Sequence, residues 1–308
     1  MENHSYKKAL AYKKAQADKK TQARKKAQVP KMVQVGLIGA GIQASHSPHM
    51  HESEARALGF ACSYQLLDIK QLGVSPEALP DLLAQVERQG FAGVNITHPF
   101  KQAVIPLLDE LSADAAAIGA VNTVVFDAGK RFGHNTDCTG FAESFRRAFA
   151  NVPRHRVVLL GAGGAGSAVA HAALQQGVEC LAVYDTDAER AALLVERLCT
   201  RFGAPRATVV TNLAAALAEA DGLIQATTVG MTGHAGMPLA VELLRSDLWV
   251  AEIICFPLET DLLKAARKLG CLTLDGSGMN VFQAVEAFRL FTGVAPDDKR
   301  MRRHFTAR

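Results

Sequence analysis

The sequence lacks the features that mark several protein classes. Its six cysteines are scattered and form no C-x-x-C pair, which is typical of reduced thiols and argues against disulfides or a zinc site. No apolar run approaches the roughly 18 to 20 residues needed to cross a bilayer, and the first 30 residues lack the apolar stretch of a secretory signal. We therefore expect a cytoplasmic protein that makes no membrane contact.

The positive charge is concentrated at one end of the chain. Residues 1–32 carry ten lysines and arginines and two acids, a local charge of +8 in a chain of net charge +4, so the remainder carries −4. The lysine pairs recur every six residues, which winds them around a helix instead of along one face. We interpret residues 1–32 as a basic, solvated tail. Polyanion binding, a targeting role and a translation start at Met32 stay open as alternatives.

The rest of the chain alternates short β-branched runs with longer helical ones, which predicts an α/β fold with helices covering a parallel sheet. A chain of 308 residues, 49% of them hydrophobic, favours two domains, and a polar break at 151–154 precedes the second. The predicted strands are Val33–Ile38, Gly93–Ile96, Val121–Phe126, Val157–Leu160, Cys180–Tyr184, Gly222–Gln225 and Trp249–Ile254. The predicted helices are about 48–58, 76–89, 100–107, 138–149, 164–176, 186–202, 212–219, 259–268 and 279–291.

A glycine-rich loop joins one predicted strand to the following helix. It consists of Gly161, Ala162, Gly163, Gly164, Ala165 and Gly166. The pattern G-x-G-x-x-G in this context is typical of a dinucleotide site, because its glycines permit a tight turn, a close approach to the pyrophosphate and close packing of helix on strand. Free N–H groups at the helix start would hold the phosphates.

Asp185 ends the next strand and points to the choice of cofactor. A carboxylate there can accept hydrogen bonds from the adenine ribose hydroxyls and would repel a 2′-phosphate, so we expect NAD and regard NADP as the alternative. Arg190 is the opposing signal, because its guanidinium could reach a phosphate or could simply pair with Asp187.

Several other segments place polar side chains next to turns. Ser45-His46-Ser47-Pro48 suits either a helix start, with Ser47 as N-cap and Pro48 at the first position, or the binding of a substrate carboxylate. A predicted strand runs into Asn95-Ile96-Thr97-His98-Pro99-Phe100-Lys101. Asp137 precedes a helix, and its residue type alone suits an N-cap as well as catalysis.

Two further features have plainer explanations. The loop that begins at Gly39 also follows a strand, but Ala44 stands where a dinucleotide loop needs its third glycine. His46, His49 and His51 are close in sequence, yet a helix starting at Pro48 would not bring them together on a metal. We therefore expect polar surface histidines and no metal.

Six ordered motifs make the sequence resemble the shikimate/quinate dehydrogenase family from Val33 to Phe305. They are S-H-S-P at Ser45–Pro48, N-I-T-H-P-F-K at Asn95–Lys101, G-A-V-N-T at Gly119–Thr123, G-H-N-T-D at Gly133–Asp137, G-A-G-G-A-G at Gly161–Gly166 and G-M-N-V-F-Q-A at Gly278–Ala284. The acidic Asp185 makes the chain similar to the NAD-linked quinate/shikimate branch.

The resemblance implies a function, a fold and a set of site residues. The activity would be reversible oxidation of a ring hydroxyl of shikimate or quinate, with hydride transfer to NAD. A substrate domain at 33–136, completed by helices of 277–308, would accompany a Rossmann domain at 137–276. Lys101 and Asp137 would be catalytic. The polyhydroxy acid would be bound by Ser45, Ser47, Asn95, Thr97, Asn122 and Gln283, and the glycine loop, Asp185, Arg190 and Gly278 would contact the cofactor.

The chain also departs from the family pattern. Family members usually have D-x-x-Y-x-P in the later strand, whereas this chain has Cys255 at the tyrosine position, which suggests a roomier pocket. Cys255 has no dedicated histidine partner, so we do not expect a nucleophile.

Three other functions stay open. They are an NADP-dependent biosynthetic shikimate dehydrogenase, a metabolite-sensing protein without turnover, and a dehydrogenase of an amino analogue. The sequence contains no helix-turn-helix pattern, so we expect no specific nucleic-acid partner. A monomer and a homodimer both stay open.

Overall fold

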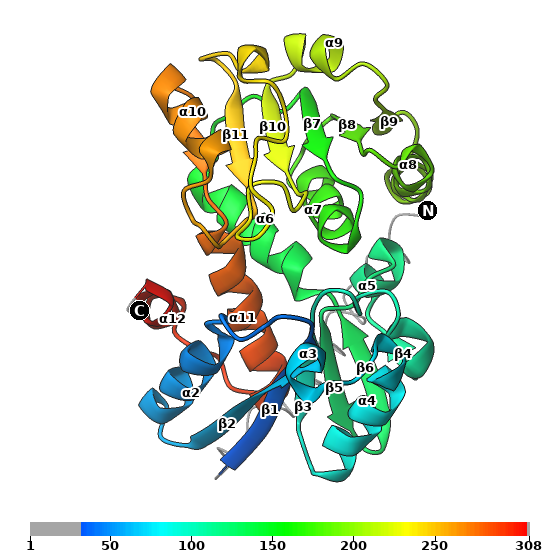
Figure 1. The fold of residues 1–308 in the computed structure, drawn as a ribbon, viewed down its shortest axis with the longest axis vertical. Helices are drawn as coiled ribbons and strands as arrows, with labels where there is room; N and C mark the ends of the chain where they lie inside the picture. The colour runs from blue at the N-terminus through cyan, green and yellow to red at the C-terminus, as the bar shows by residue number, and fades with distance from the viewer. Residues whose placement is uncertain (1–31, 307–308) are drawn as a thin grey trace, which may run out of the picture.

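The computed structural model describes residues 32–306, so the predicted basic tail lies outside the described residues except for Met32. Two sheets of six strands form the molecule, and Figure 1 shows them one above the other with α6 and α11 between them. No helix of residues 32–306 is long and apolar enough to cross a membrane.

The first sheet is mixed and has the strand order β2-β1-β3-β5-β6-β4. β1 pairs in parallel with β2 and β3, and β5 pairs antiparallel with β3 and β6. Its elements are β1 (Met32–Gly39), α2 (Ser47–Ala57), β2 (Ala61–Asp68), α3 (Ile69–Leu72), α4 (Leu79–Arg88), β3 (Gly93–Ile96), β4 (Glu110–Leu111), α5 (Ala113–Ile118), β5 (Thr123–Asp127) and β6 (Lys130–His134), with 3-10 helices at Pro76–Ala78 and Ile105–Leu107.

The second sheet is parallel throughout and has the order β12-β11-β10-β7-β8-β9. This is the strand order of a doubly wound Rossmann fold. The strands from β7 to β9 extend the sheet on one side and those from β10 to β12 extend it on the other, so the order in which strands are added changes between β7 and β10. Its elements are α6 (Thr136–Ala148), β7 (Arg156–Leu160), α7 (Gly164–Gln175), β8 (Cys180–Tyr184), α8 (Ala188–Phe202), β9 (Ala207–Val209), α9 (Leu213–Ala218), β10 (Gly222–Gln225), a 3-10 helix at Val241–Leu243, β11 (Trp249–Glu252), α10 (Asp261–Leu269) and β12 (Thr273–Leu274).

The C-terminal helices α11 (Ser277–Thr292) and α12 (Asp298–Thr306) return to the first sheet. Val281, Ala284 and Phe288 of α11 share a core with Val33 and Val35 of β1. The α/β architecture with returning C-terminal helices is therefore confirmed. The predicted domain limits, at 136 and 276, stay a prediction.

Most predicted elements are present, but three kinds of error occurred. The predicted helix at about 100–107 is wrong: the segment is a turn that ends in a short 3-10 helix, because the Lys101 carbonyl accepts its hydrogen bond from Val121 N (2.7 Å) across the sheet. The antiparallel hairpin strand β6 was missed, although Ala128 and Gly129 both have positive φ angles, as a two-residue hairpin turn requires. The strands β2, β4, β9 and β12 and the helices α3, α5 and α12 were also missed.

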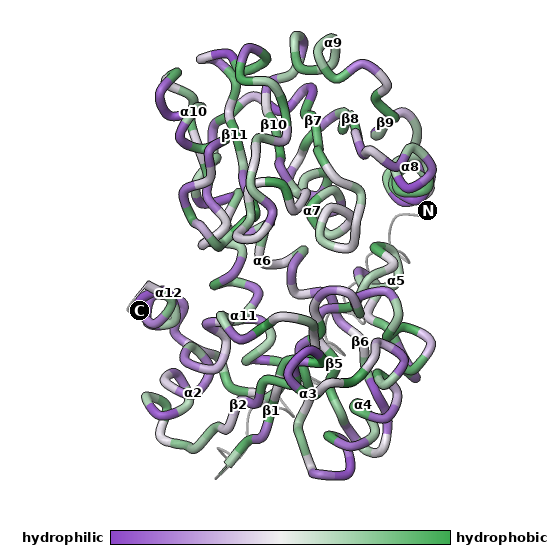
Figure 2. The backbone as a smooth tube through the Cα atoms, in the orientation of Figure 1, coloured by the Kyte–Doolittle hydropathy of each residue, from purple (hydrophilic) through white to green (hydrophobic). Residues whose placement is uncertain are grey.

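Burial on both sides explains the composition of α7. Nine of its twelve residues are buried, and Figure 2 shows its trace mostly neutral to hydrophobic, whereas the α8 trace carries several hydrophilic residues. Small alanines allow α7 to pack closely against the second sheet and also against α6 and α5.

The two helices between the sheets touch through backbone at Gly140. A Cβ at this position of α6 would lie 2.5 Å from the Met279 carbonyl oxygen and 2.7 Å from Gln283 N, both in α11. Backbone atoms cannot move aside as a flexible side chain does, so only glycine permits this approach.

Glu252 ends β11 as a buried carboxylate. It accepts hydrogen bonds from Ile253 N (2.9 Å), Ile254 N (3.1 Å) and the Thr260 hydroxyl (3.2 Å). Burial outweighs these bonds and raises the pKa of Glu252 to about 7.

We expect Gly140→Ala to destabilise the fold by about 1 to 3 kcal/mol, because the added methyl collides with the α11 backbone. The same change at an uncrowded position inside a helix would stabilise by about 1 kcal/mol. Urea unfolding followed by circular dichroism measures the difference, with exposed Thr139→Ala as the control. A stability equal to or above that of the parent would contradict the close contact.

We expect Glu252→Gln to remove part of the pH dependence of stability. The raised pKa favours the folded state below about 4.5, and this contribution, about 3 kcal/mol at most, is lost as the pH rises through about 7. The difference in stability between variant and parent should therefore shift in favour of the variant as the pH rises from 5 to 8. Melting temperatures across this range test it, with exposed Glu242→Gln as control; parallel curves for parent and Glu252→Gln would refute the assignment.

Candidate active site

Lys101 and Asp137 lie in contact, although 36 residues separate them. Lys101 belongs to the turn after β3, and Asp137 lies in the first turn of α6. Nζ of Lys101 donates to Oδ2 of Asp137 at 2.5 Å, and their side chains are 19% and 10% exposed. A charge pair so shielded from water is stronger than a surface pair, because little solvent screens it.

Asp137 is not the N-cap of its helix. That role belongs to Asn135, whose Oδ1 accepts from Cys138 N at 3.1 Å and whose Nδ2 donates to the Ala120 carbonyl. The N-cap interpretation of Asp137 is therefore wrong. Its carboxylate is directed to Lys101 instead.

The ion pair lies beside the start of α7. A Cβ at Gly164, the first residue of that helix, would be 3.5 and 3.6 Å from Cβ and Cδ of Lys101. The aliphatic stem of Lys101 thus packs over the glycine loop, and a group bound there would meet the ammonium.

A buried polar network extends from the ion pair through the first sheet. Asn95 accepts from the Tyr64 hydroxyl (2.8 Å) and donates to the Thr123 hydroxyl (3.0 Å) and the Asn122 carbonyl (3.3 Å). Asn122 accepts from Thr136 N (2.7 Å) and donates to the Thr136 hydroxyl (2.9 Å). These bonds hold Asn122 against Thr136, the residue before Asp137, and hold Asn95 against Asn122; one N–H of Asn122 has no partner among residues 32–306.

Ser45 and Ser47 lie at the start of α2, whose N-cap residue is His46. The helix begins at Ser47, so the prediction of Ser47 as N-cap is wrong; the Ser45 hydroxyl accepts from Ser47 N at 3.3 Å. The Ser47 hydroxyl is directed toward Tyr64, whose burial raises the pKa of its phenol and keeps it a donor. Ser47 is therefore joined to Asn95 through Tyr64.

Thr97 and Gln283 are half-buried at the edges of this network. The Thr97 side chain lies directly over Gly39, where a Cβ on residue 39 would collide with it. Gln283 of α11 donates to the Asn280 carbonyl at 3.0 Å. No hydrogen bond joins either side chain to the Lys101–Asp137 pair within residues 32–306. Their roles in substrate binding stay predictions.

The first glycine loop is occupied by a side chain of the same chain. The Asp68 carboxylate accepts from Gly41 N (2.8 Å), Ile42 N (3.0 Å) and Lys70 N (3.1 Å). These bonds lower the pKa of Asp68 despite its burial. The carboxylate takes the donors that a phosphate would need.

The second glycine loop has room for a pyrophosphate. A Cβ at Gly163 would meet nothing within 4 Å, whereas one at Gly166 would lie 2.1 Å from the Gly161 carbonyl oxygen. Gly166 therefore holds helix against strand while Gly163 leaves open space. The first turn of α7 directs backbone N–H groups without intrahelical partners into that space. These residues fit a dinucleotide.

Asp185 and Arg190 lie beside this loop. Oδ2 of Asp185 accepts from Ala162 N at 2.7 Å, and Arg190 lies 3.2 Å from an Asp187 oxygen and 3.9 Å from Oδ1 of Asp185. Gly278 is instead packed against Ser144 of α6, where a Cβ would clash with the serine hydroxyl. Helix packing explains this glycine, and its contact with a cofactor stays a prediction.

The surroundings of Cys255 and of His46, His49 and His51 indicate structural roles. Burial raises the pKa of the Cys255 thiol to about 12, and the thiol donates to the Gly276 carbonyl at 3.2 Å. The prediction of surface histidines is wrong for His51, which is buried against Tyr64 and Phe288 and whose pKa burial lowers to about 3. His46 packs against Phe256 and Phe305.

Sequence reasoning missed Tyr64, Thr136 and Gln225. Tyr64 lies on β2, a strand that was not predicted. The Gln225 amide is fully buried and holds the loop after β10, with bonds to the Thr227 hydroxyl and the Val229 carbonyl, both 2.9 Å. A polar residue ending a buried strand is the signal that could have identified Gln225.

The arrangement suits proton and hydride transfer at an alcohol. An ammonium and a carboxylate can bind and deprotonate one hydroxyl, and the adjoining loop has the donors for a dinucleotide. Hydroxyls and amides along the network suit a polyhydroxylated compound, because each can donate and accept.

Comparison with known proteins agrees with this geometry. Residues 37–124 match the family described as "Shikimate dehydrogenase substrate binding domain", and residues 143–231 match "Shikimate / quinate 5-dehydrogenase". The chain is 55% identical over 269 residues to "Shikimate dehydrogenase (NADP(+))" of Streptomyces avermitilis, covering 87% of this chain and 92% of that protein. It is 46% identical over 274 residues to "Quinate/shikimate dehydrogenase (NAD(+))" of Corynebacterium glutamicum, covering 88% and 97%.

Solved structures give the same result. The structure "Quinate dehydrogenase from Corynebacterium glutamicum in complex with NAD" superimposes with a TM-score of 0.84 at 45% identity, covering 90% of this chain and 99% of that one. The chain therefore belongs to the shikimate/quinate dehydrogenase family, whose members are NAD(P)-dependent oxidoreductases acting on a ring hydroxyl.

Proposed function

We propose that this chain is an NAD-linked quinate/shikimate dehydrogenase that interconverts a ring hydroxyl of the cyclic acid and the 3-dehydro ketone. The observation that carries the proposal is the Lys101–Asp137 contact over Gly164. In this contact, two groups that can exchange a full proton lie next to the loop that suits a dinucleotide.

The two side chains divide the work of proton transfer. The substrate hydroxyl binds beside Nζ of Lys101 and the Asp137 carboxylate. As the carbon–oxygen double bond forms, the hydroxyl proton passes to the lysine in its neutral amine form, which becomes the ammonium, and the hydride leaves the ring carbon for the dinucleotide. The ammonium stabilises the developing negative charge on oxygen, while Asp137 orients the lysine. The bound dinucleotide supplies the hydride acceptor. The buried amides and hydroxyls hold the ring so that its carbon faces that acceptor.

Asp185 and its neighbours support NAD as the cofactor. The carboxylate is held at the loop by its bond to Ala162 N, where it would repel a 2′-phosphate. Arg190 faces two carboxylates, those of Asp185 and Asp187, so its charge is already compensated. The Corynebacterium glutamicum relatives named with NAD give further support.

A second candidate is an NADP-dependent shikimate dehydrogenase. It is supported by the Streptomyces avermitilis relative, which is 55% identical and named with NADP(+). Initial rates with quinate and with shikimate, each with NAD and with NADP, distinguish the candidates through the appearance of the reduced nicotinamide. Binding of the acids without any reduction would favour a metabolite sensor.

We expect Lys101→Ala to lower turnover by about 100-fold or more, the usual scale of lost general acid–base catalysis. Dinucleotide binding should be retained, because the loop and α7 are unchanged. Steady-state kinetics and fluorescence titration with NAD test both statements, with the exposed neighbour Gln102→Ala as control. Near-normal turnover of Lys101→Ala would refute the catalytic assignment.

We expect Asp185→Asn together with Thr186→Arg to move cofactor preference toward NADP by about tenfold or more, because a repelling charge is replaced by an attracting one. Asparagine keeps an oxygen that can accept from Ala162 N. The measurement is the ratio of kcat/KM for the two cofactors, and Thr186→Arg alone separates the two contributions. An unchanged ratio would mean that Asp185 does not select the cofactor.

A further inference from the structure

A cavity of about 430 Å³ lies between α5 and α8, on helices that belong to different sheets. Its lining residues are Ala117, Leu193, Glu196, Arg197, Thr200 and Arg201. None of them belongs to the glycine loop, the polar network or the Lys101–Asp137 pair. The cavity is therefore separate from the site described above.

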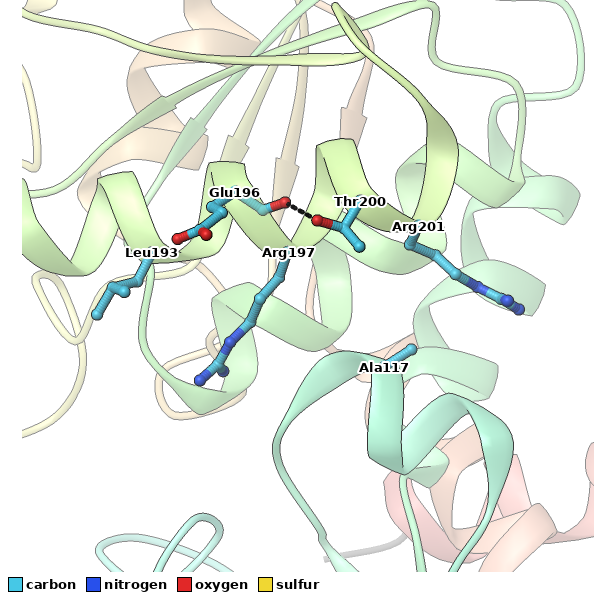
Figure 3. Close-up of a pocket in the computed structure, with 6 residues that line it drawn as sticks. All are labelled: Ala117, Leu193, Glu196, Arg197, Thr200 and Arg201. Carbon is cyan, nitrogen blue, oxygen red and sulfur yellow. Dashed lines mark hydrogen bonds between the residues drawn. The ribbon is translucent and has the colours of Figure 1, made fainter.

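Two arginines and one glutamate, Glu196, line the cavity and together give it a net positive charge. Arg197 and Arg201 are one helical turn apart on α8, and Figure 3 shows their guanidinium groups on either side of Ala117 of α5. Neither forms an ion pair or a hydrogen bond through its guanidinium within residues 32–306. The Thr200 hydroxyl is bound to the Glu196 carbonyl at 2.9 Å, so the arginines are the free donors.

An apolar wall adjoins these charges. Leu193 is 54% exposed, which is unusual for a leucine on a helix that packs through its other face. Ala117 forms the opposite side of the cavity. The volume exceeds what an inorganic anion fills, since a water takes about 30 Å³ of liquid volume. The lining suits a molecule with an anionic group and an apolar body.

One residue that lines the cavity also packs against the segment that is hydrogen-bonded to Lys101. A Cβ at Gly119, which ends α5, would lie 2.5 Å from Nη1 of Arg197, so the guanidinium rests on that glycine. Two residues later Val121 N donates to the Lys101 carbonyl. An occupant of the cavity would contact α8 on one side and Ala117 of α5 on the other, and it would reach the Gly119–Val121 segment only through Arg197.

We propose that this cavity is a binding site for a small organic anion, carrying a phosphate or a carboxylate beside an apolar group, which links α5 to α8. The anion is held by the forked donors of Arg197 and Arg201, and its apolar part covers Leu193. This site is independent of the substrate and cofactor sites.

Calorimetric titration with phenyl phosphate and with benzoate tests the proposal. Saturating NADH is present throughout, so that the dinucleotide loop is blocked. We expect saturable binding to the full chain, and a weakening of about tenfold or more in the double variant Arg197→Gln/Arg201→Gln, because two charge-assisted contacts are lost. The stronger of the two probes identifies phosphate or carboxylate as the preferred group.

Matched variants make the result decisive. Arg56→Gln/Arg88→Gln removes the same charge from exposed positions on α2 and α4 and should bind as the parent does. Leu193→Ser should weaken phenyl phosphate but leave inorganic phosphate unchanged. Equal affinities in the two arginine double variants, or binding that does not saturate in the parent, would overturn the proposal. The titration measures no turnover, so its outcome is independent of the proposed dehydrogenase activity.

Discussion

The position of Lys101 depends on three separate constraints that meet at one side chain. Its carbonyl is tied to Val121, its stem packs over Gly164, and its ammonium is bound to Asp137. These partners lie on the first sheet, on α7 and on α6, so the lysine is fixed only when both sheets are folded and adjacent. The requirement explains why residues 36 positions apart in sequence become one chemical unit, and why glycine at 164 matters beyond its role in the loop.

The polar residues around this pair are held by one another before any substrate arrives. Asn95 uses its carbonyl and both amide hydrogens within the protein, and Thr136 connects Asn122 to the helix that carries Asp137. Such a network is costly to bury unless nearly every group is satisfied. The result is rigidity, because the few donors that remain available are held in fixed directions.

The two sheets differ in how well the sequence predicts their strands and their site residues. The four central strands of the parallel second sheet were predicted, because buried strands such as Val157–Leu160 are continuous apolar runs and the glycine loop has a fixed spacing, whereas its short edge strands β9 and β12 were missed. The first sheet was predicted less well. β6 is a polar hairpin strand, and Tyr64 lies on a strand that was not recognised, so its link between Ser47 and Asn95 was invisible. Asp137 was identified with two possible roles, and only the three-dimensional position of Asn135 excluded the N-cap. Long-range contacts of this kind have no local sequence signal.

The Asp68 carboxylate occupies the backbone donors that a nucleotide phosphate would need in the first glycine loop. A ligand supplied by the chain itself acts at an effective concentration of millimolar or above, which a dissolved competitor must exceed. Free phosphate or dinucleotide at ordinary metabolite levels would have to displace a partner that never diffuses away. The first loop is thereby closed by the chain itself and serves as an internal brace for the turn between β1 and α2.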